Sequence, residues 1–92
     1  MYEGTTFNYN RKCFFGGRTV HGINVKDIVN PVGEPRMGLP LRGYVVAPDQ
    51  PAMDGQFIIT SKVVQKMESL CTDGHIEYIV RTESGSLYGG RY

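Results

Sequence analysis

Glycine and proline interrupt this 92-residue chain so often that a long helix is excluded from most of it. Twelve glycines and five prolines are present, and most of them fall between short segments of β-branched or aromatic residues. Proline fixes φ and removes a backbone donor, whereas glycine supplies the left-handed conformations that tight turns need. This punctuation is typical of an all-β domain built from short strands.

The clearest strand patterns lie in the C-terminal half of the chain. Residues 76–81 are rich in β-forming side chains and precede Ser84-Gly85, which predicts a hairpin that ends the chain. Asp54-Gly55 is a second strong turn signal, and it lies between the apolar segments 44–46 and 57–59. We therefore expect these two segments to pair with each other.

Three other segments are less clearly defined. In residues 61–70 the apolar side chains follow Thr60-Ser61 at a spacing compatible with a two-turn helix capped by a hydroxyl, or with a longer strand. Residues 25–29 leave the same choice between a helical turn and a strand. Residues 30–40 contain three prolines and two glycines, which predicts a loop whose apolar residues lie against the domain or a partner.

The number of predicted strands indicates the fold class. About five short strands in a chain of this size predict a mainly β fold, or α+β with one short helix, arranged as a small antiparallel bent sheet or open barrel. Residues 1–92 are expected to form a single small β-rich domain, in which residues 1–6 are a flexible tail.

Composition indicates which partners and which cellular compartment are compatible with this chain. Ten basic and nine acidic side chains give a net charge of +1, so the strong positive field of most nucleic-acid-binding domains is missing. The two cysteines are too few for the disulfide framework of a small secreted domain, which predicts a cytoplasmic location. No apolar run exceeds four residues, far short of the roughly 20 that cross a bilayer, so we expect a soluble protein.

A repeated cluster of glycine and arginine is the best candidate for a ligand site. FFGGR at residues 14–18 returns as LYGGRY at residues 87–92. Adjacent glycines can direct backbone N–H groups at an anion that arginine neutralises, or they can serve only as turns and as a frayed chain end. If the two segments meet, they form a site for a small anionic ligand or nucleotide. Its residues would be Gly16, Gly17, Arg18, Gly89, Gly90 and Arg91.

A second candidate surface is aromatic. The chain has six tyrosines and four phenylalanines, which is more rings than a core of this size holds easily, and exposed rings beside arginines favour protein recognition. Half-buried tyrosines in ordinary strands are the alternative. The residues that we expect to contact a partner are Arg36, Met37, Tyr44, Asp49, Met53 and Tyr88.

The residues that could support catalysis or bind metal are better explained as structural. Thr60-Ser61-Lys62 and the carboxylates Asp49, Asp54, Glu68 and Asp73 lie beside turns or at the ends of elements. Cys71 and His75 are close enough in sequence to bind one zinc ion, but Cys13 and His21 lack the spacing of a structural zinc site, which favours buried cysteines and surface histidines. We therefore predict no catalytic residue, no metal and no cofactor.

Several residues in the C-terminal half resemble a pattern in short uncharacterised bacterial and phage proteins. The pattern has the form G-x-V, D-G-x-x-I-x-T-S, T-x-S-G-x-x-Y, and its matching residues here are Gly43, Val45, Asp54, Gly55, Ile58 or Ile59, Thr60, Ser61, Thr82, Ser84, Gly85, Ser86 and Tyr88. This chain departs from the pattern at Ala52-Met53, where an aromatic residue is usual, and over a longer segment at residues 62–75. The resemblance implies a small β-domain from a phage or other mobile genome, and it supplies no active site.

These observations favour a non-enzymatic binding protein. The expected partner is a larger host protein or complex, such as a bacterial defence system, which the protein would inhibit or modulate, and the protein itself could form a homo-oligomer. A protein that binds a small anionic ligand or nucleotide through the Gly-Gly-Arg segments is the first alternative. The second is a small nucleic-acid-binding barrel with a basic face. That face would include Arg11, Lys12, Arg18, Lys62 or Lys66.

Overall fold

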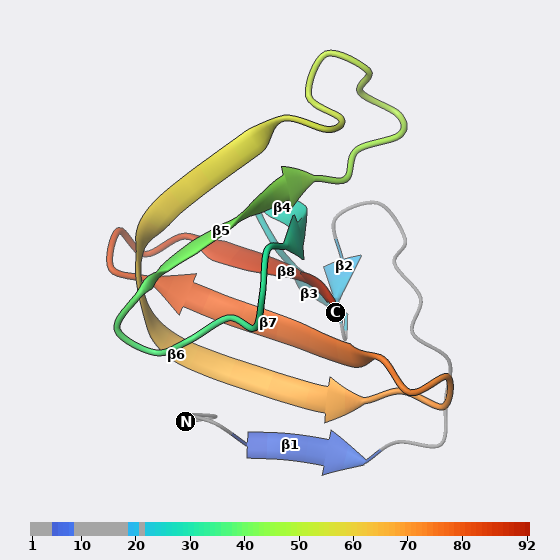
Figure 1. Cartoon of the computed structure of the whole chain (residues 1–92), viewed down its shortest axis with the longest axis vertical. Coiled ribbons are helices and arrows are strands. Elements are labelled where there is room, and N and C mark those ends of the chain that lie inside the picture. The colour runs from blue at the N-terminus through green and yellow to red at the C-terminus, as the bar shows by residue number, and fades with distance from the viewer. Residues whose placement is uncertain (1–4, 9–18, 21) are drawn as a thin grey trace.

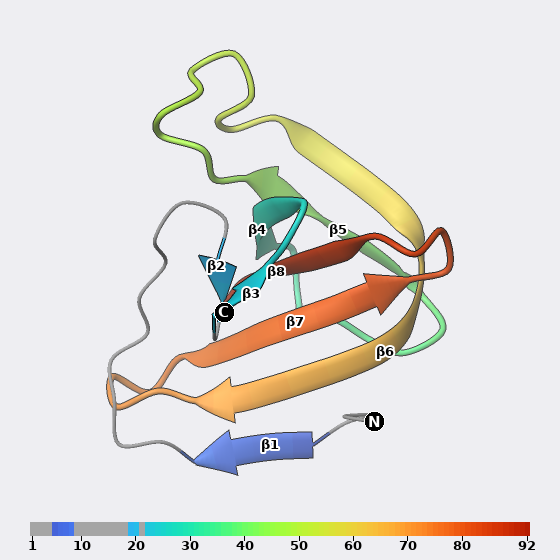
Figure 2. The same cartoon turned by 180° about the vertical axis from the view of Figure 1, so that it is seen from behind.

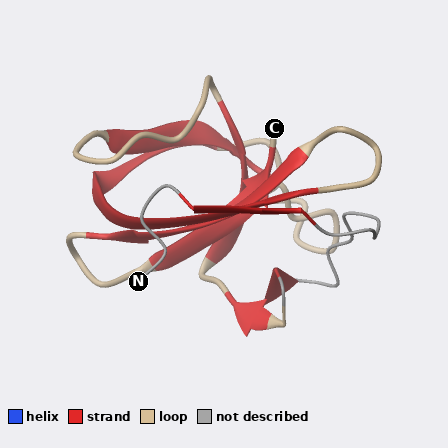
Figure 3. Ribbon diagram, turned by 90° about the horizontal axis from the view of Figure 1, so that it is seen from below, coloured by secondary structure: helices blue, strands red, loops and turns tan. Residues whose placement is uncertain are grey.

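The structure is a computed structural model, and it describes residues 5–8, 19, 20 and 22–92. In this part of the chain the regular elements are all strands (Figure 3), and none of it forms a helix long and apolar enough to span a membrane. The strands are β1 (Thr5–Asn8), β2 (Thr19–Val20), β3 (Ile23–Asn24), β4 (Asp27–Pro31), β5 (Pro40–Val45), β6 (Phe57–Leu70), β7 (Ile76–Thr82) and β8 (Leu87–Arg91).

The five strands from β4 to β8 form a closed barrel. Each strand pairs with the next in antiparallel fashion, and β8 returns to pair with β4 in parallel (Figures 1 and 2). A meander reverses direction at every step, so the first and the fifth strand run the same way and the closing pair has to be parallel. The predicted small, mainly β fold with a bent sheet is confirmed, but the barrel is closed and mixed where an open or antiparallel arrangement was expected.

The long strand β6 bends the sheet into this barrel. Its N-terminal half pairs with β5 and its C-terminal half pairs with β7, while β1 runs parallel to its last residues (Figure 1). Register shifts between Pro40 and Arg42, and again between Val63 and Gln65, mark the places where the ladder is irregular. Such irregularities increase the local bend and twist of a sheet. The helix considered for residues 61–70 is therefore wrong.

Polar side chains on the inner face explain why β6 was ambiguous. Lys66 and Glu68 are buried on this face, whereas Val64 is exposed. The apolar residues thus do not mark the inner face with the two-residue period of a half-buried strand. The helical turn considered for residues 25–29 is wrong as well, because β4 begins at Asp27 and continues to Pro31.

The predicted turns are confirmed. Gly55 and Gly85 have φ values of 83° and 88°, which side-chain-bearing residues rarely adopt. The pairing of β7 with β8 and that of β5 with β6 agree with the two predicted hairpins. Most of the predicted loop at residues 30–40 lies between β4 and β5. We call residues 32–39 the groove loop, because several of them line a surface groove that is described below.

The N-terminal prediction is only partly covered by the structure. Thr5 and Thr6, which were assigned to the predicted flexible tail, belong to β1 and pair with Met67 and Glu68 of β6. Residues 1–4 lie outside the described residues.

Two groups of apolar side chains pack on the opposite faces of β7 and β8. The barrel interior contains Val29, Leu41, Val63, Tyr78, Val80 and Tyr88. The second group is formed by Val20, Val25, Ile28 and Ile79, with Met67 and Leu87 packed against it. Within the interior group, the Tyr78 hydroxyl donates a 2.6 Å hydrogen bond to the Val29 carbonyl, which ties β7 to β4 across the barrel.

Stability should fall at alkaline pH because of Tyr78. Burial raises the pKa of its hydroxyl above the ordinary value of 10.0, so above about pH 10 the folded protein keeps a proton that the unfolded chain loses. The unfolded state then binds fewer protons, and the free energy of unfolding falls by about 1.4 kcal/mol per pH unit for this group. Urea titrations between about pH 9 and 12 measure the slope. Tyr78→Phe should make it shallower, and an unchanged slope would contradict this assignment.

Candidate functional site

The strand β5 presents alternate side chains to the barrel interior and to solvent. Leu41, Gly43 and Val45 are buried, whereas Arg42 and Tyr44 are exposed. This alternation is the two-residue period of a strand with one face on the core. Close packing against β4 explains the glycine, because a Cβ at Gly43 would overlap the Asn30 carbonyl oxygen. The outward side chains of β5 are therefore free to take part in recognition.

The N-terminal half of β6 extends this exposed surface. The register places Tyr44 opposite Phe57 and Arg42 opposite Ile59. The rings of Tyr44 and Phe57 meet edge to face with centroids 5.2 Å apart, a favourable geometry for an aromatic pair. Both rings are 48% exposed and Ile59 is 62% exposed. We call Val32, Leu39, Tyr44, Phe57 and Ile59 the outer face.

A groove of about 550 Å³ lies at one side of the outer face. Its apolar walls come from Val32, Leu39, Pro40 and Ile59, and its remaining lining includes Arg36 and Arg42. Val32 and Leu39 are more than half exposed, at 54% and 53%. The groove therefore combines solvent-exposed apolar surface with two guanidinium groups, a composition enriched in protein interfaces.

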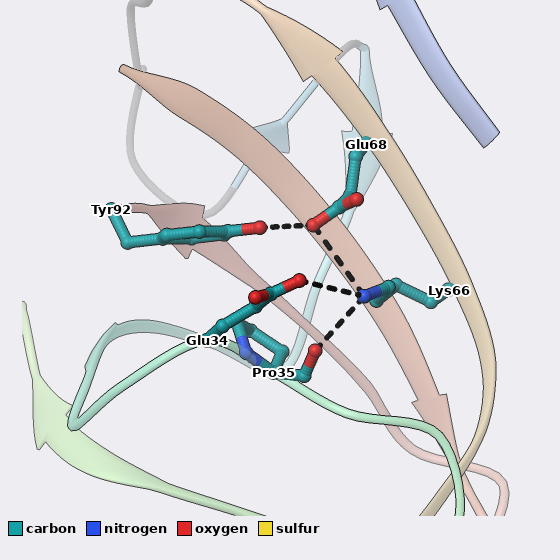
Figure 4. A network of polar contacts seen from close by, with 5 residues as sticks. All are labelled: Glu34, Pro35, Lys66, Glu68 and Tyr92. Atoms are coloured by element: carbon teal, nitrogen blue, oxygen red, sulfur yellow. Dashed lines mark hydrogen bonds and ion pairs between the residues drawn. The ribbon is translucent and has the colours of Figure 1, made fainter. Parts of the chain in front are cut away.

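A buried polar network holds the groove loop against β6 (Figure 4). The ammonium group of Lys66 donates a 2.9 Å hydrogen bond to the Pro35 carbonyl, and it lies 3.7 Å from Glu34 and 3.6 Å from Glu68. The Tyr92 hydroxyl donates a hydrogen bond to Glu68. Burial, followed by this contact with Glu68, raises the pKa of Tyr92 above its ordinary value. The network thus joins β6, the groove loop and the last residue of the chain.

Five of the six residues predicted to contact a partner are exposed or half-buried: Arg36, Met37, Tyr44, Asp49 and Met53. The structure brings Arg36 into the groove and Tyr44 onto the outer face. Asp49 and Met53 belong neither to the groove lining nor to the outer face and lie in the segment between β5 and β6. Tyr88 is different, because its side chain is buried in the barrel interior and is not available to a partner.

Sequence reasoning missed Arg42, Phe57 and Ile59. The sequence predicts one apolar strand segment over residues 57–59, whereas the structure exposes Phe57 and Ile59 and only partly buries Ile58. The alternation in β5 and the Asp54-Gly55 turn together could have predicted this exposure, since a hairpin at that turn places Phe57 beside Tyr44.

The second Gly-Gly-Arg segment is part of a strand. Gly89 and Gly90 are buried inside β8, where a Cβ would lie 2.8 Å from Val20 Cγ2 at Gly89 and would overlap the Val29 carbonyl oxygen at Gly90. Close packing therefore explains these glycines, and the alternative of turns and a frayed chain end is wrong for them. Gly16, Gly17 and Arg18 lie outside the described residues, so the meeting of the two segments stays a prediction.

Arg91 has an acidic neighbour. Its guanidinium lies 3.2 Å from the Asp73 carboxylate, and the backbone N–H of His75 donates a 3.1 Å hydrogen bond to the same carboxylate. This backbone hydrogen bond, helped by the charges of His75 and Arg91, holds the pKa of Asp73 below its ordinary value. An anion that approached Arg91 would compete with Asp73.

The hydroxyls considered for catalysis are used in the fold. Thr60 Oγ1 accepts a hydrogen bond from the Leu41 backbone N–H and donates one to the Ser61 carbonyl. Ser61 Oγ accepts a hydrogen bond from the backbone N–H of Ser84. Both residues lie within β6, so the alternatives of a helix cap or a strand terminus are wrong.

Acidic and sulfur-containing candidates also have structural roles. Asp54 accepts a 2.9 Å hydrogen bond from the Ala47 backbone N–H, and Asp73 accepts the bond from His75 described above. Cys71 is buried and disulfide-bonded, so its sulfur is not a free thiolate. Among the described residues no group of three or more His, Cys, Asp or Glu side chains could hold a metal ion. Cys13 and His21 lie outside these residues.

Comparison with known proteins assigns no family to this arrangement. No family model matches the chain, and no curated protein and no solved structure is significantly similar to it. The resemblance to short bacterial and phage proteins therefore stays a prediction, and functional inference depends on the surface itself.

Proposed function

We propose that this protein is a non-enzymatic binding protein that docks on a larger protein through its outer face. The observation that supports this proposal is the contiguity of the exposed apolar residues across β5 and β6, with the Tyr44–Phe57 aromatic pair at one end and the groove at the other. Contiguous apolar surface rimmed by polar groups marks interaction sites, whereas scattered apolar residues do not. Tyrosine and arginine are also enriched among the residues that dominate binding energy.

The resemblance to phage proteins favours a partner in the bacterial host. We propose a larger host protein or complex, such as a defence system, that the protein inhibits or modulates. The arrangement of hydroxyls and carboxylates supports binding over catalysis, because Thr60, Ser61, Asp54 and Asp73 already serve backbone hydrogen bonds.

Removing the aromatic pair should abolish this interaction. Loss of a central aromatic anchor typically weakens binding by about 2 kcal/mol or more, which is about 30-fold. We expect the tagged wild-type protein to capture a stoichiometric partner from bacterial lysate, and we expect the Tyr44→Ser/Phe57→Ser variant to lose it. Thermal unfolding of both proteins checks that the variant remains folded.

Val64→Ser is the matched control, since Val64 is also an exposed apolar residue of β6 but does not belong to the outer face. It should retain the partner. Absence of any stoichiometric partner, or equal capture by the Tyr44→Ser/Phe57→Ser variant, would count against the proposed function.

A further inference from the structure

The lining of the groove indicates what kind of ligand the groove binds, and it does so in more detail than the outer face as a whole. We infer that it recognises a polypeptide segment of the partner in which a large apolar side chain is followed or preceded by a carboxylate. The apolar side chain would lie against Val32, Leu39 and Ile59, and the carboxylate would pair with Arg36 and Arg42. This inference rests on the proposed function and adds the class of sequence that is bound.

The two arginines provide the charge complementarity. No ion pair or side-chain hydrogen bond joins the guanidinium of Arg36 or Arg42 to any other described residue. Glu34, the one acidic residue of the lining, lies 3.7 Å from Lys66. Among the described residues the two guanidinium groups of the groove thus have no ion-pair partner, and a guanidinium fork matches a carboxylate by two parallel hydrogen bonds.

The apolar walls favour polypeptide over nucleic acid. Single-stranded nucleic acid is held by aromatic rings on which bases stack and by a basic groove that follows the phosphates. The walls here are aliphatic, from Val32, Leu39 and Ile59, and the whole chain has a net charge of only +1. Aliphatic walls accept an aliphatic or aromatic side chain, and two cations neutralise one or two carboxylates.

The groove loop is fixed in place before any partner arrives. Its first residue, Val32, donates a 2.8 Å backbone hydrogen bond to Arg42, and Gly38 donates one of 2.8 Å to Val63. Between these points the Pro35 carbonyl accepts the hydrogen bond from the buried Lys66 ammonium group. A loop held at three points loses little conformational freedom on binding, which favours affinity.

Selection from a random peptide library on the immobilised wild-type protein tests the inference. We expect the recovered peptides to share a large apolar residue with Asp or Glu within one or two positions. A synthetic peptide of that consensus should bind about tenfold or more weakly to Arg36→Glu/Arg42→Glu than to wild type, because charge-assisted pairs are replaced by repulsion. Its affinity should also fall with added salt.

The controls separate charge at the groove from net charge. Lys26→Glu/Arg81→Glu changes the net charge equally at two exposed positions outside the groove, and it should bind the peptide as wild type does. A peptide in which Lys replaces the carboxylate should prefer the Arg36→Glu/Arg42→Glu protein. That exchange of preference would show that the groove, and not a change in folding, determines binding.

Four outcomes would overturn the inference. The first is the recovery of no peptide, and the second is a consensus without an acidic residue. The third is equal affinity for wild type and for Arg36→Glu/Arg42→Glu. The fourth is arginine-dependent binding of a single-stranded oligonucleotide in place of the peptides. The proposed function fails separately, through the lysate capture with the Tyr44→Ser/Phe57→Ser variant, so the two failures are distinguishable.

Discussion

Gly90→Ala is expected to lower the free energy of unfolding by about 3 kcal/mol or more. The added Cβ would overlap the Val29 carbonyl oxygen and would lie 3.1 Å from Cε2 of the Tyr78 ring. Neither neighbour can yield easily, because Val29 pairs with Val45 in the sheet and the Tyr78 hydroxyl is bonded to the Val29 carbonyl. The substitution would have to separate β4 from β8, the pair that closes the barrel.

Gly74→Ala is the control for a glycine that has room. A Cβ there would meet nothing within 4 Å, and the strain comes only from a φ of +89°. Left-handed backbone costs about 1–2 kcal/mol in a residue with a side chain, so this variant should be clearly more stable than Gly90→Ala. Urea unfolding followed by circular dichroism measures both. If Gly90→Ala were no less stable than Gly74→Ala, the tight closure of the barrel would be wrong.

The second large effect concerns the buried pair of Lys66 and Glu68. Both side chains are only 9% exposed, and removal of one member takes away the buried counter-charge of the other, which leaves Lys66 with the half-exposed Glu34 or Glu68 with the Tyr92 hydroxyl. Lys66→Met or Glu68→Gln alone is therefore expected to destabilise the protein by about 3 kcal/mol. The double variant should lose less than the sum of the two, by about 1–3 kcal/mol, because neither charge is then left behind.

A double-mutant cycle in urea measures this coupling. A sum of the single effects equal to the double effect would show that Lys66 and Glu68 do not depend on each other. The same variants connect stability with recognition. Because Lys66 holds the Pro35 carbonyl at 2.9 Å, Lys66→Met should also loosen the groove loop and weaken peptide binding, whereas Glu68→Gln leaves that hydrogen bond in place.

The parts of the fold that were predictable from sequence are those fixed by local chemistry. Asp54-Gly55 and Ser84-Gly85 specify hairpins through glycines with positive φ, and both hairpins occur. A short-range signal of this kind needs no knowledge of distant neighbours. The small, mainly β fold followed from the same punctuation.

The parts that were not predictable depend on contacts between distant residues. Lys66 was a candidate for an exposed basic face and Glu68 for a position beside a turn or an element end, and only the groove loop and Tyr92 explain their burial. Gly90 looked like part of a flexible end, and only the proximity of Val29 and Tyr78 explains it. Tertiary packing overrides local preference in each of these cases.

Only some residues of the candidate site could be predicted from the sequence, for the same reason. Tyr44 and Arg36 were identified from composition and loop position. Phe57 and Ile59 were not identified, because an apolar strand segment is assigned to the core unless the partner strand and its register are known. The error at Tyr88 was the opposite one. This tyrosine was expected at the surface, but the closed barrel buries it.

Photo-crosslinking from single positions tests most directly whether the outer face is where this protein meets its partner. A photoreactive side chain is introduced at Ile59, which is 62% exposed, and in separate proteins at Val64 and at Arg91. Irradiation in bacterial lysate should give a discrete crosslinked product from position 59 and none from positions 64 and 91. A product from position 91 with none from position 59 would contradict the account and would direct attention to the second Gly-Gly-Arg segment.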